Sequence, residues 1–237
     1  MQNKRIQEVS IPAAVNESIK KTAIEEVYSI LHSDILNGRL KPGSRLQIER
    51  LRQQYSVGSS TTREALSRLL ADDFVTTEGQ HGFRVAGVSL EDARQIYKLR
   101  AKLEAMAIQE AIKNGGDDWE GGLLSAHHRL AKVENAIEAG QDVRVAQWEN
   151  QNNNFHTALY AACDNRWLIK FRSTLYNHSI RYLRITMKEQ TVPRNVRKEH
   201  QAIFDAAMAR DSTLAEALIQ AHVRKSLESL EELFPET

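Results

Sequence analysis

The chain has little cysteine and proline, and it has no long apolar run. Its 237 residues include one cysteine, Cys163, and four prolines. A lone cysteine excludes an intramolecular disulfide framework and a zinc site built from several cysteines, and it is typical of reducing compartments. No run approaches 18 consecutive apolar residues, so we expect no membrane span. Because residues 1–18 also lack the apolar segment of a signal peptide, the sequence predicts a cytoplasmic protein.

The charge is nearly balanced overall but uneven along the chain. The formal net charge is +1, from 32 basic and 31 acidic residues. Between Gly38 and Arg68, however, seven basic residues stand against two acidic ones. A protein that binds the phosphates of DNA needs such a local excess. Charged surface helices are also common without any nucleic-acid partner, so charge alone leaves the interpretation open.

The distribution of turn-forming residues indicates two parts. Six of the eleven glycines lie between Gly38 and Gly87, and no proline falls between Pro42 and Pro193. A turn-rich stretch followed by a region with few breakers predicts a small mixed domain followed by a larger helical one. We divide the chain into an N-terminal arm, a first domain and a helical domain, with bounds at 1–17, 18–86 and 89–233.

The first domain follows the order of a winged helix-turn-helix. Apolar spacing predicts three helices, over 18–37, 47–55 and 60–72. Two short strands, 74–77 and 83–85, flank a turn that contains two glycines. In such a fold the third helix would face DNA, and small hydroxyl residues at its start can approach phosphates and base edges closely. Here the start of that helix carries Ser59, Ser60 and Thr61.

The second domain is predicted to be an antiparallel bundle of amphipathic helices. The expected helices cover 89–113, 117–139, 142–162, 165–188, 194–209 and 212–233. Helix-capping side chains are expected at Ser89, at Asp117 with Glu120, at Asp142 and at Asp211 or Ser212. Core packing is expected for an apolar row on the first helix and for the tryptophans: Ile96, Leu99, Leu103, Met106, Trp119, Trp148 and Trp167.

Polar side chains interrupt three of these apolar stripes. Asn152 and His156 are four residues apart and share one helical face, and His200 and His222 lie on the stripes of two later helices. One buried histidine is usually a satisfied core residue, but three histidines and an amide each need hydrogen-bond partners. A divalent cation would satisfy them, with zinc, nickel and manganese as the leading candidates.

Several short motifs resemble those of the GntR family of bacterial transcription regulators. They comprise the Pro42-Gly43 turn, the segment 55–58, the stretch TREALSRL at 62–69 and GFRV at 82–85. The pattern Asn152-x-x-Phe155-His156, together with Glu199-His200 and His222, is similar to the FCD-type ligand-binding domain of the FadR subfamily. The resemblance covers nearly the whole chain from about residue 18, and its motifs are specific in combination.

For DNA binding, the resemblance implies a set of contacts in the first domain. Arg63 matches the arginine of the recognition helix, and Arg45 matches a basic residue after the Pro-Gly turn. His81 and Gly82 fall at the tip of the wing, which enters the minor groove in this family. Ser59 stands where the family has a further arginine, so we expect one bidentate contact to guanine to be missing.

For ligand binding, the resemblance implies that Asn152, His156, His200 and His222 hold the metal. Many relatives have aspartate at the position of Asn152, so the amide would leave more net positive charge on the metal and favour an anionic effector. Arg100 is expected to pair with an effector carboxylate, and the alternative is a surface salt bridge with Glu104. His178 and Arg181 are predicted to rim the same pocket.

Together, these observations predict a homodimeric regulator, a repressor, that binds double-stranded operator DNA, a divalent metal and a small organic acid. Two alternatives stay open: a metal-dependent enzyme, and a regulator whose metal only stabilises the bundle. Metal catalysis usually needs a general base near the ion, and the histidine stripes carry no carboxylate. Glu199 adjoins His200 but points about 100° away from it. An enzyme would also leave residues 18–85 without a role.

Overall fold

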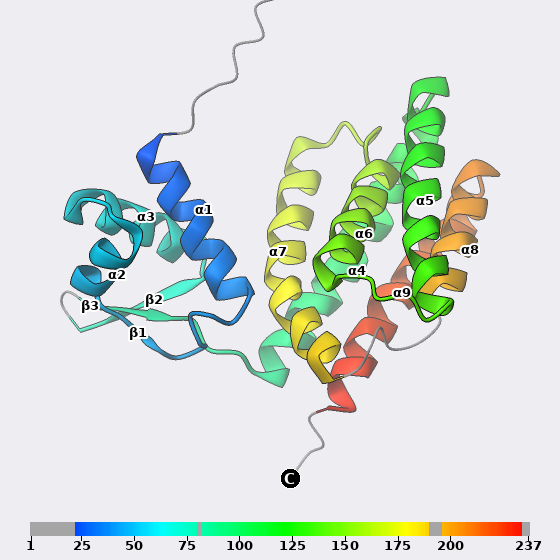
Figure 1. Ribbon diagram of the computed structural model, residues 1–237. Helices are drawn as coiled ribbons and strands as arrows, with labels where there is room; N and C mark the ends of the chain where they lie inside the picture. The colour runs from blue at the N-terminus through cyan, green and yellow to red at the C-terminus, as the bar shows by residue number, and fades with distance from the viewer. Residues whose placement is uncertain (1–21, 80–81, 190–195, 234–237) are drawn as a thin grey trace, which may run out of the picture.

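The computed structural model describes residues 22–79, 82–189 and 196–233. Within these residues the chain forms a first part with a three-stranded sheet and a second, all-helical part (Figure 1). The first part contains α1 (Ala23–Leu36), β1 (Arg45–Leu46), α2 (Ile48–Tyr55), α3 (Ser59–Ala71), β2 (Val75–Glu78) and β3 (Gly82–Val85). The second part contains α4 (Leu90–Asn114), α5 (Asp117–Glu138), α6 (Val145–Leu159), α7 (Arg166–Glu189), α8 (Val196–Met208) and α9 (Ser212–Glu231). The predicted fold class, mainly α with a winged helix-turn-helix and a helical bundle, is confirmed.

Short-range features of the sequence determine where the helices of the first part begin and end. Helix α1 begins with a capping box between Thr22 and Glu25, and α2 ends at Ser56, which adopts a left-handed conformation with φ 54°. The sheet order is β1-β3-β2, with both pairings antiparallel. Strand β1 was not predicted, because its two residues are too few to show an alternating pattern. Buried apolar side chains from all three helices and the sheet fill one core.

The helical part packs α4 against α9 and α7, and α5 against α6 and α8. Its core includes fully buried side chains from four of these helices, among them Ile108, Leu130, Phe155 and Ile203. Two predicted caps form: the Ser89 and Asp211 side chains accept from the backbone N–H of Asp92 and Leu214. The other two were wrong. Helix α5 is preceded by Gly116 and α6 by Arg144, neither with a side-chain cap, so α6 begins three residues after Asp142.

Two of the four residues in one predicted core row face outward, while Ile96 is buried and Leu103 is half-buried. Leu99 and Met106 on α4 are 48% and 54% exposed, while Arg100 and Glu104 on the same helix are buried. Trp119 and Trp148 pack inside as expected, but Trp167 is 50% exposed. Small residues form much of the buried face of α4, namely Ala93, Ala105, Ala107 and Ala111. Their small side chains allow neighbouring helices to pack closely against α4.

Helix α7 joins the two parts of the molecule. The His178 ring stacks on Phe74, with ring centroids 4.4 Å apart, and Arg184 donates to the side chain of Asn37 over 2.7 Å. Arg181 donates to the carbonyl oxygens of Ala86 and Gly87 in the connection between the parts. No helix in the described part of the chain is long and apolar enough to cross a membrane.

Candidate metal centre and DNA-binding surface

Three imidazoles meet inside the helical bundle. His156 comes from α6, His200 from α8 and His222 from α9. Their ring centroids are 4.9 to 5.5 Å apart, and one ring nitrogen from each lies within 4.8 Å of the others. All three are buried, with 0%, 0% and 6% exposure. The predicted histidines therefore lie close enough together to bind one ion.

Two of the imidazoles are oriented by carboxylates behind them. His200 Nδ1 lies 2.8 Å from Glu134 Oε1, and His222 Nδ1 lies 2.8 Å from Glu199 Oε2. An ionised carboxylate only accepts hydrogen bonds, so each Nδ1 donates, and in the neutral imidazole this leaves the lone pair on Nε2. Such carboxylate partners fix the rings of metal-binding histidines. Glu199 was predicted to point away from its neighbour His200 and so from the histidine stripes, but its carboxylate contacts His222 of the same cluster.

His156 has no such partner. Neither of its ring nitrogens has a hydrogen bond to the described residues, and the side chain is fully buried. The Oδ1 atom of Asn152, one helical turn earlier, is also buried without a partner. An unsatisfied buried polar group costs about 1–3 kcal/mol. Burial lowers the pKa of His156 well below its ordinary value, and His222 and His200 lower it further. A neutral imidazole with available lone pairs is what a divalent cation requires, so these residues fit one.

A buried ion network lies beside this cluster. Arg100 donates to Glu104 over 2.6 Å, and Arg172 Nε lies 3.7 Å from the same carboxylate oxygen. Tyr160 donates to the other oxygen over 2.8 Å. Burial alone would raise the pKa of Glu104, but Arg100 and Arg172 hold it below its ordinary value. The alternative to an effector contact, a pair of Arg100 with Glu104, thus exists, but in the interior and not at the surface. Two guanidinium groups against one carboxylate leave an excess positive charge.

Sequence reasoning missed Arg172 and Tyr176. Both are buried, and the Nε and Nη2 atoms of Arg172 have no hydrogen-bond partner among the described residues. The positive charges of Arg100 and Arg172 lower the pKa of His156, which shows that they act on the histidine cluster. The available signal was the spacing of Arg172, Tyr176 and Ser179, which share one face of α7. The apolar row on the same helix made this polar spacing hard to recognise in the sequence.

The structure does not bring His178 and Arg181 to this cluster. Both lie on α7 but contact the first part of the molecule: His178 stacks on Phe74, and Arg181 binds the carbonyl oxygens of Ala86 and Gly87. Their expected place at the rim of an effector pocket is therefore wrong. The side chains of His178 and Arg181 point from α7 in other directions than those of Arg172 and Tyr176. The apolar stripe of the helix does not by itself show this difference.

The first part presents an exposed basic surface on its recognition helix. Arg63 is exposed on α3 and has no ion-pair partner in the part of the chain that the structure describes. Ser59 and Ser60 are exposed at the start of α3, and Thr61 is half-buried. Of the expected wing-tip residues, Gly82 begins β3 and His81 lies outside the described residues.

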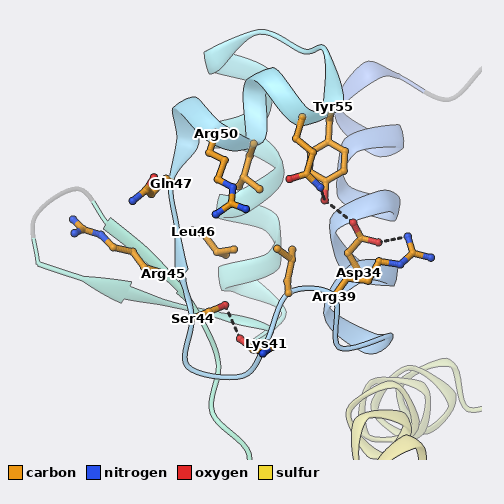
Figure 2. A pocket seen from close by; sticks show the side chains of 12 residues that line it. Asp34, Arg39, Lys41, Ser44, Arg45, Leu46, Gln47, Arg50 and Tyr55 are labelled. Atoms are coloured by element: carbon orange, nitrogen blue, oxygen red, sulfur yellow. Dashed lines mark hydrogen bonds and ion pairs between the residues drawn. The ribbon is translucent and has the colours of Figure 1, made fainter.

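A pocket of about 380 Å³ lies between the end of α1, β1 and α2 (Figure 2). Its one acidic group, Asp34, accepts from Arg39 over 2.7 Å and from Tyr55 over 2.5 Å. Arg45 at its edge is 63% exposed and lies 3.4 Å from Glu78. The lining therefore keeps an excess of positive charge, from Arg39, Lys41, Arg45 and Arg50.

Two protein-family descriptions match the chain. Residues 23–85 match the bacterial regulatory proteins of the gntR family, and residues 95–225 match the FCD domain. The chain belongs to the GntR family of bacterial transcriptional regulators. It is 39% identical over 207 residues to an uncharacterized HTH-type transcriptional regulator, BphR of Paraburkholderia xenovorans, covering 87% of this chain and 84% of that protein.

Other relatives agree with this GntR assignment. The chain is 34% identical over 200 residues to the HTH-type transcriptional repressor GlaR of Escherichia coli, covering 83% of this chain and 90% of the repressor. The solved structure of E. coli McbR/YncC shares the fold, with a TM-score of 0.74 and 22% identity, over 90% of this chain and 99% of that one. These GntR relatives are transcriptional regulators, and the chain is a DNA-binding regulator, not an enzyme.

Proposed function

We propose that this GntR regulator is a cytoplasmic, homodimeric repressor whose FCD domain binds a divalent metal ion and a small carboxylate effector. The supporting observation is His156, which is fully buried between His200 and His222 and whose ring nitrogens have no hydrogen-bond partner among the residues that the structure describes. A repressor role agrees with the name of the relative GlaR. Each subunit would place its α3 in the major groove of one half of a palindromic operator.

The metal would be held by Asn152, His156, His200 and His222, and zinc, nickel or manganese fits this set. Four neutral ligands leave the full charge of the cation in place. When bound, the ion supplies a positive centre at which a carboxylate can coordinate. Arg100 and Arg172 add a second positive centre nearby, with the unpartnered donors of Arg172 available to a ligand. An anionic effector is therefore favoured over a neutral or cationic one.

Helix α7 supplies a physical connection between effector and operator. One face carries Arg172 and Tyr176 beside the histidine cluster, and another carries His178 and Arg181, which hold the first part. An effector that pulls Arg172 would move a helix that also positions the DNA-binding domain. The physical basis for such coupling would be an element whose position both sites bias, and the contacts of α7 with both parts support it as that element.

The metal proposal predicts that His156→Ala combined with His200→Ala removes the ion. Purified wild-type protein is expected to carry about one ion per chain by elemental mass spectrometry, and the double variant none, because only two ligands remain. The matched control is His128→Ala, which changes an exposed histidine on α5. Unchanged metal content in the double variant would refute the metal site.

The DNA-binding proposal predicts that Arg63→Ala abolishes the mobility shift of the promoter fragment beside the protein's own gene. Loss of a base-reading arginine costs roughly 1–3 kcal/mol per half-site. Because the Arg63 side chain is exposed, the circular dichroism spectrum should not change. Arg129→Ala, on the exposed side of α5, is the control at equal salt. If Arg63→Ala shifts the fragment as well as wild type does, Arg63 does not read DNA.

A further inference from the structure

A groove of about 700 Å³ lies between α4 and α9. The two helices run in opposite directions here, because Arg94 near the start of α4 donates to Glu231 at the end of α9 over 2.7 Å. Pockets that bind small organic molecules have volumes of about 300–1,000 Å³, so this one is large enough for a ligand. We call it the α4/α9 groove, and six of its lining residues decide its chemistry: Tyr97, Lys98, Ala101, Lys102, Arg224 and Leu227.

Three cations in the α4/α9 groove have no ion-pair partner. Lys98 and Lys102 on α4 and Arg224 on α9 are exposed, and none of them pairs with a carboxylate of a residue that the structure describes. The fourth cation, Arg94, is bonded to Glu231 instead. One more glutamate lines the groove, so the cations outnumber the carboxylates by four to two. A cleft lined mainly by one sign of charge attracts a ligand of the other sign, here an anion.

The floor of the α4/α9 groove is apolar. Tyr97 is buried, with 2% exposure, and half-buried Ala101 and Leu227 pack against the same hydrophobic cluster. The Tyr97 hydroxyl donates to the carbonyl oxygen of Ser179 on α7 over 3.4 Å, which holds its polar end inside the bundle. The short side chain of Ala101 leaves space above this floor. The groove therefore combines an apolar base with unpaired cations on both walls.

We propose that the α4/α9 groove binds a planar aromatic anion, an aryl carboxylate or sulfonate. The flat ring would cover the apolar floor. The long side chains of Lys98 and Arg224, one from each wall, can place their charges over the ring face and beside the anionic group. A small aliphatic acid would leave the floor uncovered, and a neutral ring would leave the cations without a counter-charge. This inference goes beyond the proposed function, because none of the described lining residues is a histidine and the groove needs no metal ion.

The groove is separate from the candidate metal centre but adjoins it. The guanidinium carbon of Arg100 lies 5.8 Å from the centre of the Tyr97 ring, so Tyr97 stands between the groove and the buried ion network. On α9, Arg224 follows His222 by two residues. A carboxylate could therefore reach either place in a binding experiment. The experiment needs an anion that coordinates metals poorly and protein from which the metal has been removed.

The test is titration calorimetry of chelator-treated, full-length protein with naphthalenesulfonate. We expect saturable binding of about one molecule per chain. Lys98→Glu combined with Arg224→Glu should raise the dissociation constant at least about 30-fold, because two attractive charges become repulsive. Ala101→Phe keeps every charge but fills the space above the floor, and it should raise the constant at least about 10-fold. The control is Arg129→Glu combined with Lys132→Glu, which reverses two exposed cations on α5 and should leave the constant unchanged.

Two analogues of the probe separate the contributions of ring and charge. Naphthalenemethanol keeps the ring without the charge, and methanesulfonate keeps the charge without the ring; each should bind at least about 10-fold more weakly than naphthalenesulfonate. The proposal is overturned if the wild type shows no saturable binding, if either analogue binds as tightly as the probe, or if either groove variant keeps wild-type affinity. Circular dichroism should be the same for all variants. Metal content and operator binding of untreated protein report on the proposed function, so either proposal can fail alone.

Discussion

At the residue scale, Glu104 is the most constrained charge that the structure describes. Its side chain has 0% exposure, and it contacts Arg100, Arg172 and Tyr160. A buried charge is tolerated only when it is paired and hydrogen-bonded. Removing the carboxylate would leave two guanidinium groups in the interior with no counter-charge. Glu104 therefore balances the positive charge beside the histidine cluster.

We predict that Glu104→Gln lowers the free energy of unfolding by roughly 3–5 kcal/mol, the usual cost of breaking a buried pair. Urea unfolding monitored by tryptophan fluorescence measures it. The matched control is Glu138→Gln, since Glu138 pairs with Arg197 over 2.7 Å but both side chains are 45% exposed. An exposed pair contributes about 0–1 kcal/mol. If the two variants lose the same free energy of unfolding, Glu104 contributes no more than an exposed ion pair does.

The histidine cluster could be found from the sequence, and its supporting residues could not. Asn152 and His156 share a face by their spacing of four, and two more histidines interrupt apolar stripes, so helical periodicity alone brings them to one interior. Glu134 is different, because it reaches His200 only through the packing of α5 against α8. A contact between helices 66 positions apart leaves no mark on the local pattern of either one.

At the element scale, helix ends were easier to predict than helix faces. The bounds of α4 differ from the predicted 89–113 by one residue at each end, because a serine cap and a glycine mark them. The prediction of its buried face was wrong for Leu99 and Met106, because α4 has two apolar faces. One face is buried and combines alanines with larger residues such as Ile96 and Ile108, and the other carries the exposed Leu99 and Met106. Periodicity identifies an apolar face but does not state whether the same chain or another one covers it.

Helix α7 carries a pH-dependent contact between the two parts. Burial lowers the pKa of His178, and the nearby Arg181 lowers it further, against smaller opposite effects of Asp73 and Asp92. His32, on the other side of Phe74, also has a pKa lowered by burial. When the folded-state pKa is lowered, the unfolded chain binds more protons. The stability that the two neutral imidazoles contribute is therefore complete above pH about 6.5, and it is lost as the pH falls below that value.

We predict that His178→Phe makes stability less sensitive to acid. Phenylalanine keeps the stacking on Phe74 but does not titrate. The fall in melting temperature between pH 7.5 and pH about 5 should be smaller than in wild type, with metal-saturated protein at both pH values. His128→Phe, which replaces an exposed imidazole, is the control and should follow wild type. A fall as large as that of wild type would show that His178 is not the titrating group.

At the scale of the whole molecule, the regulator is expected to link three binding events. Stabilisation by a ligand that binds only the folded state reaches about 2.7 kcal/mol at a concentration 100 times its dissociation constant. For a chain of this size each kcal/mol raises the melting temperature by about 2–4 °C. In a panel of mono- and dicarboxylic acids, the effector should raise the melting temperature of metal-loaded protein, and a chelator should remove the effect. Destabilisation by chelator with no response to any acid would mean that the metal only stabilises the bundle.

The same linkage fixes the relation between effector and operator. If the acid weakens operator binding by some factor, the operator must weaken acid binding by the same factor, because both paths around the cycle have the same free energy. We expect this factor to be between about 5 and 150, the usual range for such coupling. Titration calorimetry gives acid affinity with and without operator duplex, and fluorescence anisotropy gives operator affinity with and without acid. Arg172→Lys should reduce both factors together, since its single ammonium cannot reproduce the planar contacts of Arg172 on α7. If Arg172→Lys leaves this common factor unchanged, α7 is not the element that connects the two sites.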